Sequence, residues 1–269
     1  MNILIPMAGA GKRFEEAGYT VHKPLIPTIY RKTGEKVPMV VCATKDLPDI
    51  TECGDNIIYI DRDFHRRDGV EDVIRAYYPK SRFITLDYLT EGQASTCLLA
   101  KGLINNQESL LIAACDNGMV FEDDKLKKVM KSADVIVFTY RHNEGVLENP
   151  NAHGWVIPDT DGRVAAVSVK KAVSDIPTED HAIVATFWFK HGSIFVDAAE
   201  KMISENDRIN NEFYVDQVLK HLMDCGYEIK VFEIDQYLGW GTPSDYENYM
   251  NTINYWYEFI RDNRHVFIE

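Results

Sequence analysis

Short apolar runs alternate with amphipathic segments along the first half of the chain, and this alternation most constrains the fold. Five runs rich in β-branched and aromatic residues predict buried strands at Asn2–Pro6, Asn56–Ile60, Arg82–Leu86, Leu110–Ala114 and Val135–Tyr140. Between them, helical spacing groups Val70, Val73, Ile74 and Tyr77 on one helix face, and Leu98, Leu99 and Leu103 on another. Strands that alternate with helices in this way pair in parallel, so we predict an α/β fold with a doubly wound sheet.

The second half of the chain changes character. It predicts strands at Gly154–Pro158, Arg163–Val169 and Ala182–Lys190, then helices at Ser193–Ser204, Glu212–Cys225 and Pro243–Ile260. No Pro/Gly/Ser-rich linker interrupts the 269 residues, so we expect one domain over residues 1–269, with halves of about 1–145 and 146–269. Ligands of open parallel sheets bind beyond the carboxyl ends of the strands, so the loops after Pro6, Leu86 and Cys115 should face one crevice.

Composition and charge exclude several classes of function. The net charge of −13 repels nucleic-acid backbones and anionic lipids, so nucleic acid and membranes are not expected partners. The five cysteines are odd in number and none are spaced C-x-x-C, which argues against a disulfide framework and a zinc site. No stretch approaches the roughly 20 apolar residues of a membrane span, and the apolar N-terminal run is too short for a signal peptide. We therefore expect a cytoplasmic protein.

A glycine-rich loop follows the first predicted strand. Its small residues, Ala8, Gly9, Ala10 and Gly11, let the backbone approach an anion closely, and Lys12 and Arg13 add positive charge. The loop is not a P-loop, because Pro6 and Arg13 stand where that motif needs Gly and Ser or Thr, and it is not a dinucleotide fingerprint, because Phe14 fills the third small position. A tight turn with solvated basic residues is the alternative interpretation.

The segment His22-Lys23-Pro24-Leu25 is the second candidate element. Pro24 makes the backbone rigid and extended, which is one way to hold Lys23 over the glycine loop. The alternative is a surface lysine in a turn.

Together, these two elements resemble the opening signature of the sugar nucleotidylyltransferase family. The match is to G-x-G-x-R-F followed after about ten residues by K-P-L, and it is carried by Gly9, Gly11, Arg13, Lys23, Pro24 and Leu25. The resemblance implies a single-domain, Rossmann-like, three-layer α/β/α nucleotide-diphospho-sugar transferase fold with a mixed, mainly parallel sheet. It also implies that residues 8–12 and Arg13 hold a nucleoside triphosphate and that Lys23 contacts the reacting phosphates.

Further segments resemble the family in its own order. Glu91–Thr96 resembles the segment that reads the base, which implies nucleotide-binding roles for Gly92, Gln93 and Ser95. Asp116 stands at the position of the family's magnesium-binding aspartate. Lys171 matches the lysine that contacts the second substrate, with Lys170 at the preceding Glu position, and Thr186 and Glu212 are further substrate-binding candidates. Gly241-Thr242-Pro243 resembles the closing G-T-P motif. The first half would then bind the triphosphate and the second half the acceptor.

The second metal ligand departs from the family pattern. That carboxylate usually lies two residues before the glycine of G-T-P, where this chain has Gly239. Asp235 is the nearest upstream carboxylate, although it is out of register. Either Asp116 holds Mg²⁺ with phosphates and water, or another carboxylate such as Asp235 supplies the second ligand.

The resemblance implies attack by an acceptor phosphate on the α-phosphorus of the triphosphate, with Mg²⁺ as cofactor and pyrophosphate as product. The L-G-W-G-T-P closing motif is most similar to the cytidylyltransferases of capsule and surface-polysaccharide synthesis. CMP transfer from CTP to phosphoglutamine, to a similar phosphorylated metabolite or to a sugar 1-phosphate is therefore expected. Two alternatives stay open: a metal-dependent glycosyltransferase of the same fold that uses a nucleotide-sugar, and a non-enzymatic nucleotide sensor. The aromatic tail Tyr255-Trp256-Tyr257 can pack on its own domain or on a partner, so the oligomeric state stays open too.

Overall fold

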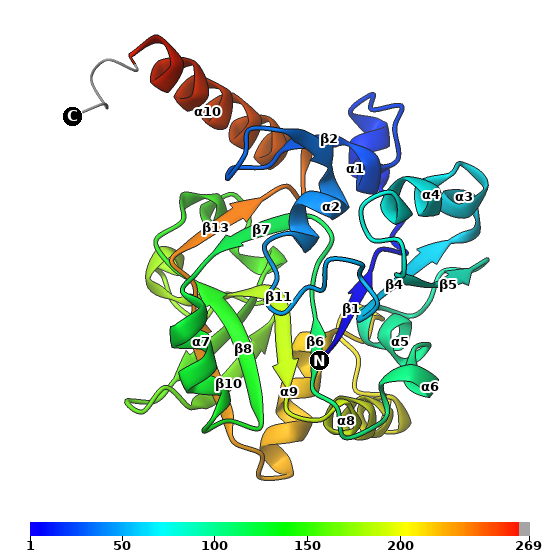
Figure 1. Ribbon diagram of the computed structural model, residues 1–269. Coiled ribbons are helices and arrows are strands. Elements are labelled where there is room, and N and C mark those ends of the chain that lie inside the picture. The colour runs from blue at the N-terminus through cyan, green and yellow to red at the C-terminus, as the bar shows by residue number, and fades with distance from the viewer. Residues whose placement is uncertain (264–269) are drawn as a thin grey trace.

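Nine strands of the described residues, 1–263, form the central sheet of the computed structural model (Figure 1). Seven of them lie in the order β10-β9-β11-β6-β1-β4-β5, and β8 pairs with β11 and β12. Their bounds are β1 (Asn2–Pro6), β4 (Ile57–Arg62), β5 (Arg82–Leu86), β6 (Leu110–Ile112), β8 (Val135–Tyr140), β9 (Gly154–Pro158), β10 (Val164–Val169), β11 (His181–Phe189) and β12 (Ile229–Glu233). Every strand predicted from the sequence is present, with ends that shift by at most two residues.

The sheet is mixed, with a parallel centre. Strands β6, β1, β4 and β5 run parallel, and β11 then crosses the molecule antiparallel to β6, β8 and β9. Two small antiparallel pairs lie beside it, β2 (Pro27–Ile29) with β3 (Lys36–Pro38) and β7 (Asn117–Val120) with β13 (Gln236–Gly239). The arrangement confirms the expected Rossmann-like α/β fold, and both halves of the chain contribute strands to one sheet.

Helices cover both faces of this sheet (Figure 1). Their bounds are α1 (Lys12–Glu16), α2 (Met39–Thr44), α3 (Asp63–Arg67), α4 (Val70–Arg75), α5 (Gln93–Leu98), α6 (Lys101–Ile104), α7 (Asp123–Met130), α8 (Gly192–Ser204), α9 (Val215–Asp224) and α10 (Pro243–Asp262). Short 3-10 turns lie at Lys23–Leu25, Glu144–Leu147, Pro150–Ala152 and Pro177–Glu179. Within residues 1–263, no helix has both the length and the apolar character needed to cross a membrane.

Alternate strand residues feed two hydrophobic cores, one on each face of the sheet. In β1, Ile3 and Ile5 pack into one core and Leu4 into the other, as the period-2 geometry of a strand requires. The first core is covered by α2, α4 and α7, and the second by α5, α8 and α9. The central strands are buried on both faces, which explains why they are continuously apolar in sequence.

The helix face predicted for residues 95–103 is wrong. The segment forms two short helices, α5 and α6, and Leu99 between them is exposed. The buried positions are Ala94, Thr96, Cys97, Ala100 and Ile104. All but Ile104 are small residues. Helix α5 contacts β1 and α8, and α6 contacts α8. Because the helices approach their neighbours closely, the face with small side chains is buried here, and not the face with the largest apolar side chains.

Candidate active site

A cavity of about 1180 Å³ opens beyond the carboxyl ends of β1 and β6. The loop after Pro6 and the segment at Cys115 both line it, as expected, whereas the loop after Leu86 contributes only its far end, Gln93. The glycine-rich loop lines it through Gly9, Ala10, Gly11, Lys12 and Arg13. Ala8 is buried and is not among the residues that line the cavity.

Lys23 and Asp116 meet in this cavity, although 92 residues separate them in the chain. The Lys23 Nζ donates to Asp116 Oδ2 at 2.7 Å and to the Gly241 carbonyl at 2.9 Å, and it lies 5.1 Å from the centre of the Phe14 ring. Burial lowers the pKa of Lys23, but the charge of Asp116, the interaction with Cys115 and the hydrogen bond to Asp116 together outweigh burial, so the net shift is upward. The opening motif, Asp116 and the closing motif therefore converge on one ammonium group.

The glycine loop shapes the approach of Lys23. Gly11 adopts φ +66°, and a Cβ there would lie 3.7 Å from the Cβ of Lys23, so the loop and the Lys23 turn pass closely. Lys12 and Arg13 follow at the start of α1, and both side chains are exposed on the cavity wall. Three cationic side chains thus surround the space in front of the loop.

The segment at Asp116 is fixed through its backbone. Trp240 N donates to the Asp116 carbonyl at 3.0 Å, and Gly239 pairs with Asn117 where β13 meets β7. Gly239 therefore stands opposite Asn117, the residue after the candidate metal ligand Asp116, at the position where the family pattern has a second carboxylate. Asp235 lies elsewhere: its carboxylate is 3.9 Å from Lys125, is half-exposed, and lines neither cavity of the site. The structure does not bring Asp235 to Asp116, because β13 carries it to the far end of the β7–β13 pair.

A second cavity of about 290 Å³ adjoins the first. Both cavities share the residues at their junction, which are Gln93, Ala114, Asp116, Ala185 and Glu212. Glu212 and Gln93 thus lie where the sequence predicted substrate contacts. Thr186 does not line either cavity; it is fully buried, and its neighbour Ala185 faces the site instead. Ala185 has φ +58° within an irregular stretch of β11. This local turn directs the Ala185 side chain, and not that of Thr186, toward the site.

At the end of β10, Lys170 and not Lys171 reaches the site. Lys170 lines the second cavity, whereas Lys171 is exposed and lies outside it. Lys170 has φ +57°, so the chain turns sharply at the end of the strand and directs consecutive side chains differently. The Lys170 Nζ donates to the Ala152 carbonyl and lies 5.2 Å from the centre of the Tyr214 ring.

Carboxylates and aromatic rings complete the second cavity. Asp216, which is only 9% exposed, lines it, and burial raises its pKa to about 6 despite the attraction of Lys170. Gly154 leaves the space for this carboxylate, since a Cβ there would collide with Asp216 Oδ2. Tyr140 and Tyr237 stack with ring centres 4.2 Å apart. The cavity combines one lysine, three carboxylates (Asp116, Glu212 and Asp216) and flat apolar surfaces.

The segment expected to read the base packs tightly behind the junction. Gly92 has φ +122°, and a Cβ there would lie 2.5 Å from the Phe213 N, so only glycine fits. Phe213 N donates to the Glu91 carbonyl at 2.8 Å, which couples this segment to Glu212. Ser95 is half-buried and lies outside both cavities.

Sequence reasoning missed a small cluster at the rim of the larger cavity. His22 Nε2 lies 2.6 Å from Asp68 Oδ2, and its ring contacts Phe64 and His65, which also line the cavity. Burial, with the repulsion of His22 added, lowers the pKa of His65 to about 4, so that imidazole is neutral at pH 7. No motif marked α3, and only the adjacency of His22 to Lys23 pointed to this region.

Comparison with known proteins supports the fold. No family model and no curated protein sequence matches the chain. Among solved structures, the chain is similar to a nucleoside-diphosphate-sugar pyrophosphorylase from Vibrio cholerae, with 18% identity over 93% of this chain and 99% of that one, and a TM-score of 0.72. It is also similar to the inositol-1-phosphate CTP transferase from T. maritima, with 15% identity, 94% and 95% coverage and a TM-score of 0.64.

A third similar structure is HddC from Yersinia pseudotuberculosis, which was solved in complex with GMP-PN. It shares 17% identity over 93% of this chain and 98% of that one, with a TM-score of 0.62. The chain therefore has the fold of solved nucleotidyltransferases over nearly its whole length.

Proposed function

We propose that this chain is a nucleotidylyltransferase that joins a nucleoside triphosphate to a phosphorylated small molecule. The supporting observation is that two cavities of different character meet at Asp116. The larger one carries the glycine loop with Lys12, Arg13 and Lys23, and its volume suits a nucleotide. The smaller one carries Lys170 and suits a compact acceptor. A transfer between two substrates needs this arrangement, whereas a nucleotide sensor needs only the first cavity.

The chemistry is an in-line displacement at the α-phosphorus. An acceptor phosphate oxygen forms the new P–O bond, the bond to the β-phosphate bridging oxygen breaks, and pyrophosphate leaves with that electron pair. A phosphate monoester is already anionic near pH 7, since its second pKa is about 6, so no general base is required. Catalysis then consists of alignment and charge neutralisation. Arg13 and Lys23 supply fixed positive charge to the triphosphate, and Lys170 supplies it to the acceptor.

The residues at the junction fit Mg²⁺ as a one-carboxylate site. Asp116 is partly exposed to the cavity, and within residues 1–263 no cluster of three or more His, Cys, Asp and Glu side chains is arranged for metal binding. Mg²⁺ suits such a site, because it is commonly held by one or two carboxylates with phosphate oxygens and water. The bound ion would neutralise phosphate charge. Asp116 must then turn from Lys23 toward the ion or be shared between the two.

For the finer specificity we propose CTP as the nucleotide. The motif resemblance to cytidylyltransferases of capsule and surface-polysaccharide synthesis supports it, as does the likeness to a solved inositol-1-phosphate CTP transferase. The proposed acceptor is phosphoglutamine, a related phosphorylated metabolite or a sugar 1-phosphate. The small second cavity, with Glu212, Asp216 and Lys170, suits an acceptor that carries polar groups besides its phosphate.

A matrix of substrates tests the proposal. The purified protein is incubated with Mg²⁺, one of four nucleoside triphosphates, and one of a panel of sugar 1-phosphates, inositol 1-phosphate, phosphocholine and phosphoglutamine, while pyrophosphate is followed. Release that requires one acceptor, and is fastest with CTP, is the expected result. Binding of a triphosphate with no release for any acceptor would instead favour a sensor. Turnover only with nucleotide-sugars would favour a glycosyltransferase.

A further inference from the structure

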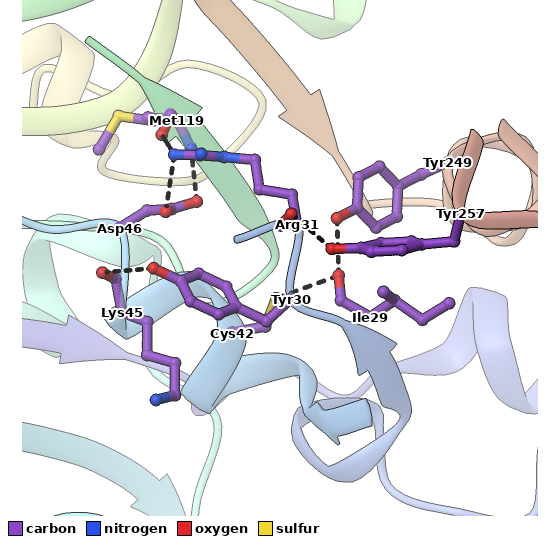
Figure 2. Close-up of polar contacts among 9 residues, drawn as sticks. All are labelled: Ile29, Tyr30, Arg31, Cys42, Lys45, Asp46, Met119, Tyr249 and Tyr257. Atoms are coloured by element: carbon purple, nitrogen blue, oxygen red, sulfur yellow. Dashed lines mark hydrogen bonds and ion pairs between the residues drawn. The ribbon is translucent and has the colours of Figure 1, made fainter. Parts of the chain in front are cut away.

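A buried ion pair stands behind the Asp116 segment without lining either cavity. Arg31, just after β2, donates from Nη2 to Asp46 Oδ1 at 3.0 Å, and Asp46 follows α2 (Figure 2). The Asp46 side chain is 1% exposed and that of Arg31 is 20% exposed. A buried ion pair is a poor way to gain stability, because desolvation offsets most of its attraction. Its partners therefore indicate what else it does.

The pair binds both backbone groups of one residue, Met119. Arg31 Nη2 donates to the Met119 carbonyl at 3.1 Å, and Asp46 Oδ2 accepts from the Met119 N–H at 3.3 Å (Figure 2). Met119 lies in β7, whose strand partner among residues 1–263 is β13. The ion pair thus fixes a strand that begins one residue after Asp116.

Gly118 shows how closely the pair packs against this segment. A Cβ at Gly118 would lie 2.8 Å from Asp46 Oδ2 and 3.0 Å from Cη2 of Trp240. Any side chain there would push Asp46 or Trp240 away. This contact gives a physical reason for glycine two residues after Asp116.

The same pair is joined to the other side of the site through α10. Tyr257 Oη donates to the Arg31 carbonyl at 2.7 Å, and Tyr249 Oη donates to the Ile29 carbonyl at 2.7 Å (Figure 2). Helix α10 begins two residues after Gly241, whose carbonyl accepts from Lys23. The contacts close a ring from Lys23 through Gly241, α10 and the Arg31–Asp46 pair back to Asp116.

We propose that Arg31 and Asp46 are positioning residues that hold the Asp116 carboxylate against the Lys23 ammonium. They touch neither substrate and act through the Met119 backbone. The catalytic consequence rests on the proposed function, since a displaced Asp116 would bind the metal–triphosphate complex poorly. The geometric consequence, loss of the Lys23–Asp116 contact, does not depend on the proposed function.

The decisive variant replaces both partners, Arg31→Met with Asp46→Leu. Apolar replacement of a whole buried ion pair is often neutral for stability, but here it also removes partners of the Met119 N–H and carbonyl, which lowers stability. Thermal unfolding is therefore measured first, to establish that the double variant is folded. The first readout is the ¹⁵N-detected ammonium signal of Lys23 in the ligand-free protein, assigned by its loss in Lys23→Arg. Its protons should exchange slowly in the original protein and rapidly in the double variant. A matched control, Arg163→Met with Glu228→Leu, removes another Arg–carboxylate pair, at 2.6 Å, and should leave the signal unchanged.

The second readout is Mn²⁺ binding in the presence of a non-hydrolysable CTP analogue. It is measured from the electron paramagnetic resonance signal of free Mn²⁺. The dissociation constant should rise about tenfold or more in the double variant, as expected when the groups that orient a metal ligand are removed. A folded double variant with an unchanged Lys23 signal would overturn the inference. If the original protein binds no Mn²⁺–nucleotide, the proposed function fails, while the Lys23 signal still decides the role of the pair. If the double variant unfolds, Asp46→Asn provides the same comparison.

Discussion

The ammonium of Lys23 lies 2.7 Å from the carboxylate of Asp116; the Lys23 side chain is 17% exposed and that of Asp116 is 30% exposed. The contact joins a lysine from the opening motif to the candidate metal ligand. In the proposed reaction both groups act on the same phosphates. Their ion pair is therefore the arrangement that a metal–triphosphate complex would meet in the ligand-free site.

Substitution of Lys23 by Met should lower turnover more than it weakens nucleotide binding. The positive charge acts where negative charge moves in the transition state, so we expect kcat to fall about 100-fold or more. Lys12→Met, at an exposed position on the same loop, is the matched control and should mainly raise the KM for the triphosphate. Steady-state pyrophosphate release measures both. A Lys23→Met variant with the original kcat would remove Lys23 from the mechanism.

Asp116→Asn and Asp235→Asn separate the two candidate metal ligands. Asp116 faces the junction of the cavities, whereas Asp235 lies outside them near Lys125. The Mg²⁺ concentration for half-maximal velocity should rise about tenfold or more in Asp116→Asn and stay unchanged in Asp235→Asn. If the Mg²⁺ concentration for half-maximal velocity shifts equally in both variants, or only in Asp235→Asn, then Asp235 is a metal ligand.

The two lysines after β10 make another matched pair. Lys170 lines the acceptor cavity and Lys171 is exposed outside it. We expect Lys170→Met to raise the KM for the acceptor about ten- to 100-fold, the range of a lost hydrogen bond to a charged group, while Lys171→Met leaves it near the original value. Acceptor titrations at saturating nucleotide measure the difference. The opposite ranking would mean that the turn at Lys170 reverses when the acceptor binds.

Buried Asp216 predicts a pH dependence of stability. Its pKa in the folded protein is raised to about 6, above that of the unfolded chain, so the folded state holds the proton more tightly. This carboxylate therefore costs stability increasingly as pH rises from about 4 to about 6. Asp216→Asn should gain about 2–3 kcal/mol over the original protein at pH 7.5, and much less at pH 4.5.

Denaturant unfolding at the two pH values gives these free energies. Asp161→Asn, in the exposed turn between β9 and β10, is the control and should show the same small difference at both pH values. A gain for Asp216→Asn that does not change between pH 4.5 and 7.5 would contradict the raised pKa.

The sequence predicted the architecture well, because burial on both faces of a sheet leaves a strong apolar signal. The strands Asn2–Pro6, Arg82–Leu86 and Val135–Tyr140 have the predicted ends. The resemblance to the nucleotidylyltransferase motifs also implied that the glycine loop, Lys23 and Asp116 share one site, and the structure brings them together.

The structure departs from the expected placement of site residues where local backbone geometry decides a side chain's direction. Lys170 and Ala185 have positive φ although neither is glycine, and each takes the place in the site that was predicted for its neighbour, Lys171 or Thr186. Strand periodicity carries no signal for such a turn. The Arg31–Asp46 pair escaped prediction for a different reason, because its effect on Met119 depends on three segments that are distant in the sequence.

The most direct test of nucleotidylyl transfer is a ³¹P NMR spectrum of one reaction that contains the protein, Mg²⁺, CTP and the acceptor that gives pyrophosphate release. The proposed function predicts that pyrophosphate and a new diphosphate-linked product appear in equal amounts, and only when the acceptor is present. Inorganic phosphate or CDP formed without an acceptor, with no diphosphate-linked product, would contradict it.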